Sequence, residues 1–275
     1  MTILKEIFST PILVRALIVG ILVSLCAALL GVSLVLKRYS MIGDGLSHVG
    51  FGALAIAAVM NLAPMAVAIP VVIIAAFLLL RLSSNSKIKG DSAIALISTG
   101  ALAVGVMAVS MSHGMNIDLN SYLFGSIISV SGSDVIVSVI LSLAVLVMFV
   151  LFYTKIFAIT FDESFAKATG IKVNFYNMLI ALLTAVTIVI GMRLMGSMLI
   201  SSLIIFPALC SMRIFKSFKS VTICSAVVSV VTFIIGMFIS YAADTPCGAS
   251  IVCVNIVAFA LFFVVGAIVS ANRKK

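Results

Sequence analysis

Long apolar runs without a charged residue recur along the whole chain, and each is about as long as a membrane is thick. A spanning helix needs about 20 apolar residues, because each residue adds about 1.5 Å to its length. The runs that contain no Asp, Glu, Lys or Arg are 16–36, 49–80, 92–117, 135–154, 173–192, 194–212, 220–243 and 245–272. Asn61 and Pro64 divide the second run into two short helices. We therefore expect an all-α integral membrane protein, a polytopic helical bundle of about nine transmembrane helices.

Eight spans are the alternative to nine. A segment near Pro64 or near Pro207 would then re-enter the membrane without crossing it, which is possible only where protein covers its backbone. No polar connection between the runs is long enough to form a separate soluble domain. We expect the whole chain, 1–275, to be a single transmembrane domain.

The composition excludes several classes of protein. Hydrophobic residues make up 64% of the chain and charged residues 9%, and the mean hydropathy is +1.39. An ordinary soluble domain is about a quarter charged. A soluble enzyme, a nucleic-acid-binding protein and a disordered chain are therefore excluded. The net charge of +9 does not indicate nucleic acid, because no basic patch is interleaved with aromatic residues.

Positive charges follow every second apolar run. They are Lys37, Arg38, Arg81, Lys87, Lys89, Lys155, Lys167, Lys172, Arg213, Lys216, Lys219 and Arg273 to Lys275. Basic loops remain in the cytoplasm, so this pattern predicts an outward N-terminus and an inward C-terminus. Arg193 is an exception, because it lies between two runs on the predicted outer side, and Lys5 and Arg15 near the N-terminus also lie on that side.

The segment Gly43-Asp44-Gly45-Leu46-Ser47-His48 holds the first candidate site. Ionisable residues near membrane spans are functional candidates, because lipid is a costly environment for charge. Asp44 and His48 are four residues apart and so share one helix face. A carboxylate and an imidazole together suit a borderline divalent ion such as zinc. The alternative is structural: Asp44 caps a helix and His48 bonds a neighbour. The two roles are compatible.

Two predicted outer loops carry weaker candidates for metal binding. His113 and Asp118 lie in the loop 112–133, and Asp244 begins the segment Asp244-Thr245-Pro246-Cys247-Gly248. Each place is a candidate waypoint for an external metal ion. The alternative is an ordinary solvated loop, and an Asp before Thr-Pro is also typical of a turn.

A cytoplasmic segment, 161–171, has the pattern of a short amphipathic helix. Asp162 and Glu163 stand at its start, where the helix dipole favours acids, and Gly170 stands at its end, where glycine often terminates a helix. Phe165 and Ala168 fall on one face. Such a helix either joins two spans passively or docks into a partner protein, and the residues alone leave both possibilities open.

Several segments together resemble those of a known family. They are Gly43-Asp44 with Ser47-His48, Tyr122-Leu123-Phe124-Gly125, the stretch from Gly196 to Ala208, and Asp244-Thr245-Pro246 with Gly248. The chain resembles the ABC-3 family of metal ABC-importer permeases, which serve zinc, manganese and iron. The resemblance runs from about residue 10 to 270. The segment Tyr122 to Gly125 favours the zinc-uptake branch, while Cys247 departs from the small residue usual at its position.

This resemblance implies a type II ABC importer permease in a bacterial cytoplasmic membrane, surrounded by lipid and without a nucleic-acid partner. Two copies would pair, two ATPase chains would bind ATP, and an extracytoplasmic protein would deliver the metal. No cofactor would be bound permanently, and the divalent metal would be cargo. Asp44 and His48 would be pathway or gate residues. The segment 161–171 would be the coupling helix that docks on the ATPase, through Asp162, Glu163, Phe165, Ala166 and Gly170.

Three classes of function are considered for this chain: the permease of an ATP-driven importer, a stand-alone metal transporter and a structural scaffold. The chain has no P-loop, so it is not expected to hydrolyse ATP or to act as an enzyme by itself. A stand-alone, proton-coupled metal transporter would need no docking helix and would bury several carboxylates as proton relays. A purely structural membrane scaffold would not need Asp44 and His48. The sequence therefore favours the permease of an ATP-driven importer, with zinc as the expected cargo and manganese next.

Overall fold

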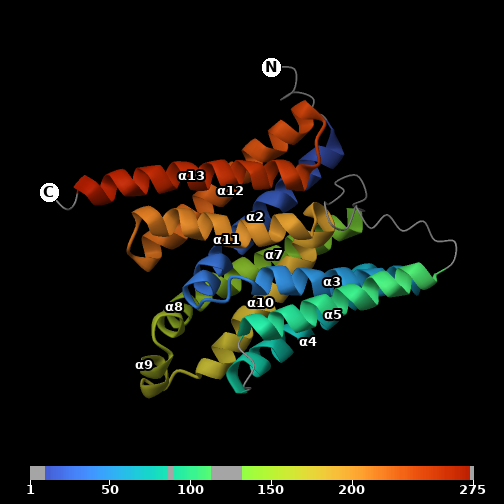
Figure 1. Ribbon diagram of the computed structural model, residues 1–275, viewed down its shortest axis with the longest axis horizontal. Coiled ribbons are helices and arrows are strands. Elements are labelled where there is room, and N and C mark those ends of the chain that lie inside the picture. The colour runs from blue at the N-terminus through green and yellow to red at the C-terminus, as the bar shows by residue number, and fades with distance from the viewer. Residues whose placement is uncertain (1–9, 86–89, 113–131, 273–275) are drawn as a thin grey trace.

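The computed structural model describes residues 10–85, 90–112 and 132–272, and these residues are almost entirely helical (Figure 1). Nine of the described helices are long and apolar enough to cross a membrane, which agrees with the expected number. They are α2 (Pro11–Leu36), α3 (Ile42–Val59), α4 (Pro64–Asn85), α5 (Gly90–Met111), α7 (Gly132–Leu151), α10 (Val173–Met195), α11 (Ser197–Ile214), α12 (Phe218–Ala243) and α13 (Cys247–Asn272). Two short helices, α8 (Tyr153–Phe161) and α9 (Glu163–Ala168), connect α7 to α10.

Two prolines determine how the spans divide. Pro64 opens α4, where a missing N–H costs nothing, and Asn61 just before it has a φ of 53°. The expected break between the second and third spans is therefore present. Pro207, in contrast, lies inside α11 without ending it, so α11 is a continuous helix of 18 residues. Both segments that the eight-span alternative questioned are long enough to cross.

The second span begins earlier than the charge pattern predicts. The charge-free run starts at 49, but α3 starts at Ile42 and so contains both Asp44 and His48. The helix tolerates these side chains because Asp44 lies in its first turn, where the dipole favours an acid, and because neither side chain is fully buried. The fourth span ends at Met111, just before the predicted outer loop 112–133.

Inner and outer helices differ in how much of their surface the protein covers. In the most apolar 18-residue stretch of α3, 72% is buried inside the protein, and the corresponding share is 67% in both α2 and α10. In α5 the corresponding value is 11%, and in α13 it is 17%. One continuous apolar core contains residues from every described helix. Because α2, α3, α10 and α11 have the largest buried shares, they form the centre of the bundle, and the other spans surround them. The candidate pair on α3 is thus held by the best-packed part of the bundle.

The turns with basic residues gather at one end of the bundle. In Figure 1 the α2–α3 turn, α8 and α9, the α11–α12 turn and the end of α13 all lie toward the left. The α10–α11 and α12–α13 turns lie toward the right. This separation is what the positive-inside pattern predicts. We call the left end the cytoplasmic end and the right end the outer end.

Candidate functional site

Asp44 and His48 are partly exposed on a helix whose other faces are packed. Nearly all residues of α3 from Ile42 to Leu54 are buried, but the side chains of Asp44 and His48 are 45% and 29% exposed. The Nε2 atom of His48 lies 3.6 Å from Oδ2 of Asp44. That separation is too long for a good hydrogen bond and leaves both atoms available to a third partner. The helix therefore presents one acid and one imidazole together, near the cytoplasmic end.

The capping alternative for Asp44 does not match the helix boundary. Met41 occupies the N-cap position of α3, and no side chain makes a capping hydrogen bond there. The main-chain oxygen of Asp44 accepts a hydrogen bond from the Ser47 hydroxyl at 2.7 Å, but that contact does not involve the carboxylate. The position of Asp44 still benefits from the helix dipole.

Two buried polar atoms near the pair have no hydrogen-bond partner among the described residues. They are Nδ1 of His48 and Oγ of Ser201. Ser201 belongs to α11, and its Cα lies 3.9 Å from the position that a Cβ on Gly43 would occupy. Because unpaired buried polar groups are costly, these atoms mark a place that a water or an ion can satisfy. Sequence reasoning did not single out Ser201, although the segment from Gly196 to Ala208 contains it.

One copy of the chain supplies too few ligands for a closed metal site. Among the described residues, no group of three or more His, Cys, Asp or Glu side chains gathers in one place. A structural zinc site normally has four protein ligands. Asp44 and His48 therefore form an open, two-ligand arrangement, which suits an ion that must also leave.

The weaker candidate residues are not assembled with this pair. His113 and Asp118 lie outside the described residues, as does the segment from Tyr122 to Gly125. Asp244 is exposed and ends α12 in a left-handed conformation with a φ of 51°. It lies in the α12–α13 turn at the outer end, far along the bundle from the start of α3 (Figure 1). Its geometry is that of a helix C-cap and turn residue.

A well-capped short helix, α9, lies inside the predicted segment 161–171. Oδ1 of Asp162 accepts a hydrogen bond from the N–H of Phe165 at 2.9 Å and so caps the start. At the end, Gly170 has a φ of 82°, and its N–H donates to the oxygen of Lys167. The N–H of Ile171 donates to the oxygen of Ala166, which completes a Schellman motif.

The two faces of α9 have opposite environments. Ala166 is fully buried against the bundle. Phe165 is 64% exposed. An aromatic ring presented on a rigid, doubly capped helix is suited to docking into a partner.

Glu163 connects α9 to two of the inner helices. Its Oε1 lies 2.7 Å from Nζ of Lys37, the C-cap residue of α2. The Asn177 amide on α10 donates to the same Oε1 at 3.1 Å, and Lys37 also donates to the amide oxygen of Asn177. From the sequence, Lys37 was interpreted only as one of the cytoplasmic positive charges. Its contact with Glu163 joins residues 126 positions apart, and no local sequence pattern predicts it.

The Lys37 contact keeps Glu163 ionised. Burial alone would raise the pKa of Glu163, but the hydrogen bonds from Lys37 and Asn177, together with the positive charge of Lys37, lower it below its ordinary value of 4.5. A lowered folded pKa means that the contact contributes stability above the ordinary value and loses it as the pH falls through the folded value. Across the neutral range the ion pair is therefore intact.

The profile of the ABC 3 transport family matches residues 9–266. The chain belongs to this family. A curated manganese transport system membrane protein, MntC, from Halalkalibacterium halodurans is 31% identical over 94% of this chain and 88% of its own length. The high-affinity zinc uptake system membrane protein ZnuB from Haemophilus influenzae is 29% identical over 91% of this chain and 96% of its own length.

Solved structures agree with the family and with the fold. PsaBC from Streptococcus pneumoniae, solved in complex with Fab, has a chain that is 29% identical, with a TM-score of 0.85 over 95% of this chain and 94% of that one. An inward-facing metal-chelate type ABC transporter shares the fold at 16% identity, with a TM-score of 0.75 over 91% of this chain and 85% of that chain. This ABC-3 family member is a multi-pass membrane protein and the permease subunit of a bacterial ABC importer, without catalytic activity of its own. The stand-alone carrier and the scaffold are thereby set aside.

The permease pairs Arg193, an arginine at the outer end, with an acid. Arg193, near the end of α10, places Nη2 at 2.8 Å from Oδ2 of Asp134 in the first turn of α7. Both side chains are largely buried, at 21% and 14% exposed. This exception to the positive-inside pattern is therefore part of a salt bridge between two spans at the outer end, which sequence reasoning did not predict.

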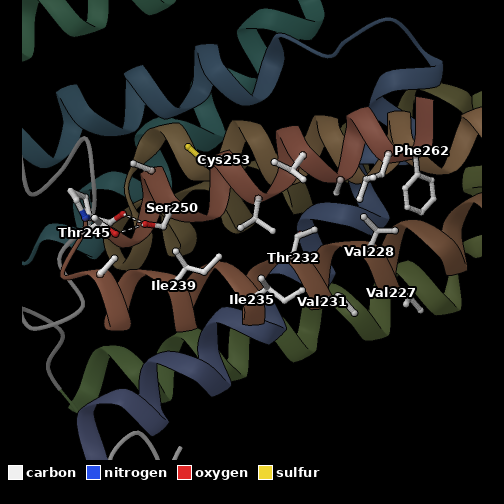
Figure 2. A pocket seen from close by; sticks show the side chains of 17 residues that line it. Val227, Val228, Val231, Thr232, Ile235, Ile239, Thr245, Ser250, Cys253 and Phe262 are labelled. Carbon is white, nitrogen blue, oxygen red and sulfur yellow. Dashed lines mark hydrogen bonds between the residues drawn. The ribbon is translucent and has the colours of Figure 1, made fainter. Parts of the chain in front are cut away.

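An apolar groove between two of the spans is not a metal site. It lies between α12 and α13, has a volume of about 870 Å³, and is lined by aliphatic side chains such as Val231, Ile235 and Ile239 (Figure 2). The Thr245 and Ser250 hydroxyls lie 2.7 Å apart at one end, and Thr232 and Cys253 line the groove further along (Figure 2). The lining holds no carboxylate and no imidazole, and its single thiol, Cys253, belongs to no cluster of metal ligands among the described residues, so the groove does not form a metal site.

Proposed function

We propose that this chain is the permease of an ATP-driven importer that carries a divalent transition metal, manganese or zinc, into the cytoplasm. The observation that carries the proposal is the Asp44 and His48 pair, partly exposed on an otherwise buried helix. The relatives named for manganese and zinc transport support the class of cargo. The metal is substrate, and no resident cofactor is part of the proposal.

The pair is proposed to hold or gate the ion where two copies of the permease meet. Two carboxylates and two imidazoles, one of each from either copy, supply four ligands, which is the usual number for zinc. The position of Asp44 near the cytoplasmic end favours a gate at the exit over a site midway across. Either role needs a neutral imidazole, because protons compete with metal for its nitrogen.

Partners follow from the same proposal. Two cytoplasmic ATPase chains would dock on α9 of either permease copy, and an extracytoplasmic binding protein would deliver the ion at the outer end. The exposed ring of Phe165 and the capped ends of α9 support its role as the coupling helix. Asp162, Ala166 and Gly170 would keep the helix rigid, and Glu163 would tie it to the bundle.

Binding strength alone cannot identify the cargo. Affinity for divalent ions at any nitrogen and oxygen site generally rises from manganese to zinc. Zinc is therefore expected to bind the pair more tightly even if manganese is the ion transported. The relatives named for the two metals have similar identities, 31% and 29%, so they do not separate the possibilities. The zinc preference suggested by Tyr122 to Gly125 remains part of the proposal.

The test is uptake by the whole complex in vesicles. The permease is reconstituted with its ATPase, the binding protein is supplied outside, and uptake of radioactive zinc and manganese is followed with and without ATP. We expect ATP-dependent uptake of one or both ions, reduced strongly in the Asp44→Ala and His48→Ala complexes. Absence of ATP-dependent uptake of either metal by an assembled wild-type complex would overturn the proposal.

A further inference from the structure

Three polar side chains from three distant segments meet at the cytoplasmic end. Lys37 ends α2, Glu163 begins α9, and Asn177 lies in the first turns of α10. Each of the three is hydrogen-bonded to the other two, with Lys37 to Glu163 at 2.7 Å and Asn177 to Glu163 at 3.1 Å. We call this set the Lys37 triad.

The triad differs from an ordinary surface ion pair. Exposed pairs contribute little, because water screens them and both side chains lose freedom. Glu163 is 53% exposed, but the Lys37 side chain is only 8% exposed, and two acceptors on different helices hold its ammonium group. Its position is thus determined by α9 and α10 as much as by α2.

Lys37 is also the first residue of the turn that leads to the metal pair. The turn is tight: the N–H of Tyr39 donates to the oxygen of Leu34 at 2.8 Å, and the N–H of Ile42 donates to the oxygen of Tyr39 at 3.0 Å. Helix α3 begins at Ile42, and Asp44 lies in its first turn. A displacement of Lys37 is therefore passed through a short, hydrogen-bonded segment to the start of α3.

We propose that the Lys37 triad transmits movement of α9 to the α2–α3 turn, so that docking of the ATPase on α9 shifts the start of α3, which carries Asp44 and His48. The inference rests on the proposed function and identifies Lys37, Glu163 and Asn177 as positioning residues. The other acid of α9, Asp162, is occupied in capping the helix. Glu163 is thus the acid of α9 that can make this connection.

Charge removal and charge exchange test the proposal together. Glu163→Gln and Lys37→Met each remove the ion pair, and the double variant Lys37→Glu with Glu163→Lys restores it in reverse. The matched control is Lys216→Met, an exposed lysine in the α11–α12 turn. Each complex, with its ATPase and binding protein, is assayed in vesicles for metal ions imported per ATP hydrolysed.

We expect either single variant to import about tenfold fewer ions per ATP, as loss of one charged hydrogen bond allows. The ATPase should still co-purify, the exchanged pair should recover much of the ratio, and Lys216→Met should match wild type. Single variants with the wild-type ratio would overturn the inference. Single variants that lose the ATPase, without recovery in the exchanged pair, would also overturn it, because the triad would then only maintain the fold. A wild-type complex that imports no metal would instead refute the proposed function.

Discussion

At the scale of single residues, Asp44 is the position where the proposed function can be tested most directly. An amide has nearly the size of a carboxylate and can satisfy a helix start, but it is a poor metal ligand. We expect Asp44→Asn to lower metal uptake at least about tenfold, as loss of a metal contact does. Uptake by the assembled complex is the measurement, with thermal unfolding of the permease as a check on the fold.

The same change at Asp244 is the matched comparison. Asp244 ends α12 with a φ of 51°, and asparagine adopts this left-handed conformation readily. We therefore expect Asp244→Asn to fold and to transport normally. Normal uptake in Asp44→Asn would return Asp44 to a structural role at the helix start. Loss of uptake in Asp244→Asn would identify Asp244 as a metal waypoint after all.

At the scale of elements, α9 depends on its C-terminal glycine. Gly170 has a φ of 82° and no atom near the position of a Cβ, so the cost of a side chain there is purely conformational. A left-handed conformation costs an ordinary residue about 1–2 kcal/mol, a large amount for a helix of one and a half turns. We expect Gly170→Val to uncouple ATP hydrolysis from metal uptake while the membrane spans unfold at the wild-type temperature.

Gly170→Asn is the control for this change, because asparagine tolerates the left-handed region. It should leave coupling close to wild type. ATP hydrolysis and metal uptake are measured on the same vesicles, and co-purification reports docking. Full coupling in Gly170→Val, with normal ATPase binding, would show that the order of α9 is not needed.

A second element-scale prediction concerns the contact between α3 and α5. A Cβ on Gly52 would lie 2.5 Å from the main-chain oxygen of Ala101, closer than real Cβ contacts. The helices must therefore separate to admit even a methyl group, which costs about 1–3 kcal/mol in a packed core. We expect Gly52→Ala to lower the unfolding temperature and to weaken uptake, because α3 carries the metal pair.

Gly100 on α5 provides the matched position, since no heavy atom lies within 4 Å of its added Cβ. Gly100→Ala should leave the unfolding temperature unchanged or raise it slightly, as alanine favours helix over glycine. Thermal unfolding in one detergent measures both variants. Equal unfolding temperatures for the two would mean that the close approach at Gly52 does not limit packing.

Local patterns predicted the elements well and the contacts between them poorly. The nine spans follow from charge-free runs, and the bounds of α9 follow from Asp162 and Gly170, because caps are properties of neighbouring residues. The Lys37 contact with Glu163 could not be predicted, because a lysine in a cytoplasmic turn looks alike whether it is solvated or paired. The charge-free run alone starts the second span too late, at 49, because Asp44 stabilises the first turn of α3 and does not interrupt the helix.

At the scale of the whole molecule, one permease chain is expected to be incomplete. Among the described residues, the metal pair offers two ligands, and a second copy would double them. We expect the purified complex to contain two permease chains and two ATPase chains by native mass spectrometry. The permease reconstituted alone should show no ATP-dependent uptake. A complex with one permease chain, or robust uptake by the lone chain, would contradict this.

The salt bridge between Arg193 and Asp134 has a consequence for the biogenesis of the protein. Moving one positive charge outward against a membrane potential of 100 mV costs about 2.3 kcal/mol. Helix α7 precedes α10 in the chain, so Asp134 is synthesised first. Once Asp134 is at the outer side, Arg193 can pair with it, and in the folded protein the two side chains are 2.8 Å apart. The pair adds no net charge to the outer side. The permease can therefore carry an outward arginine without reversing the orientation that its cytoplasmic lysines establish.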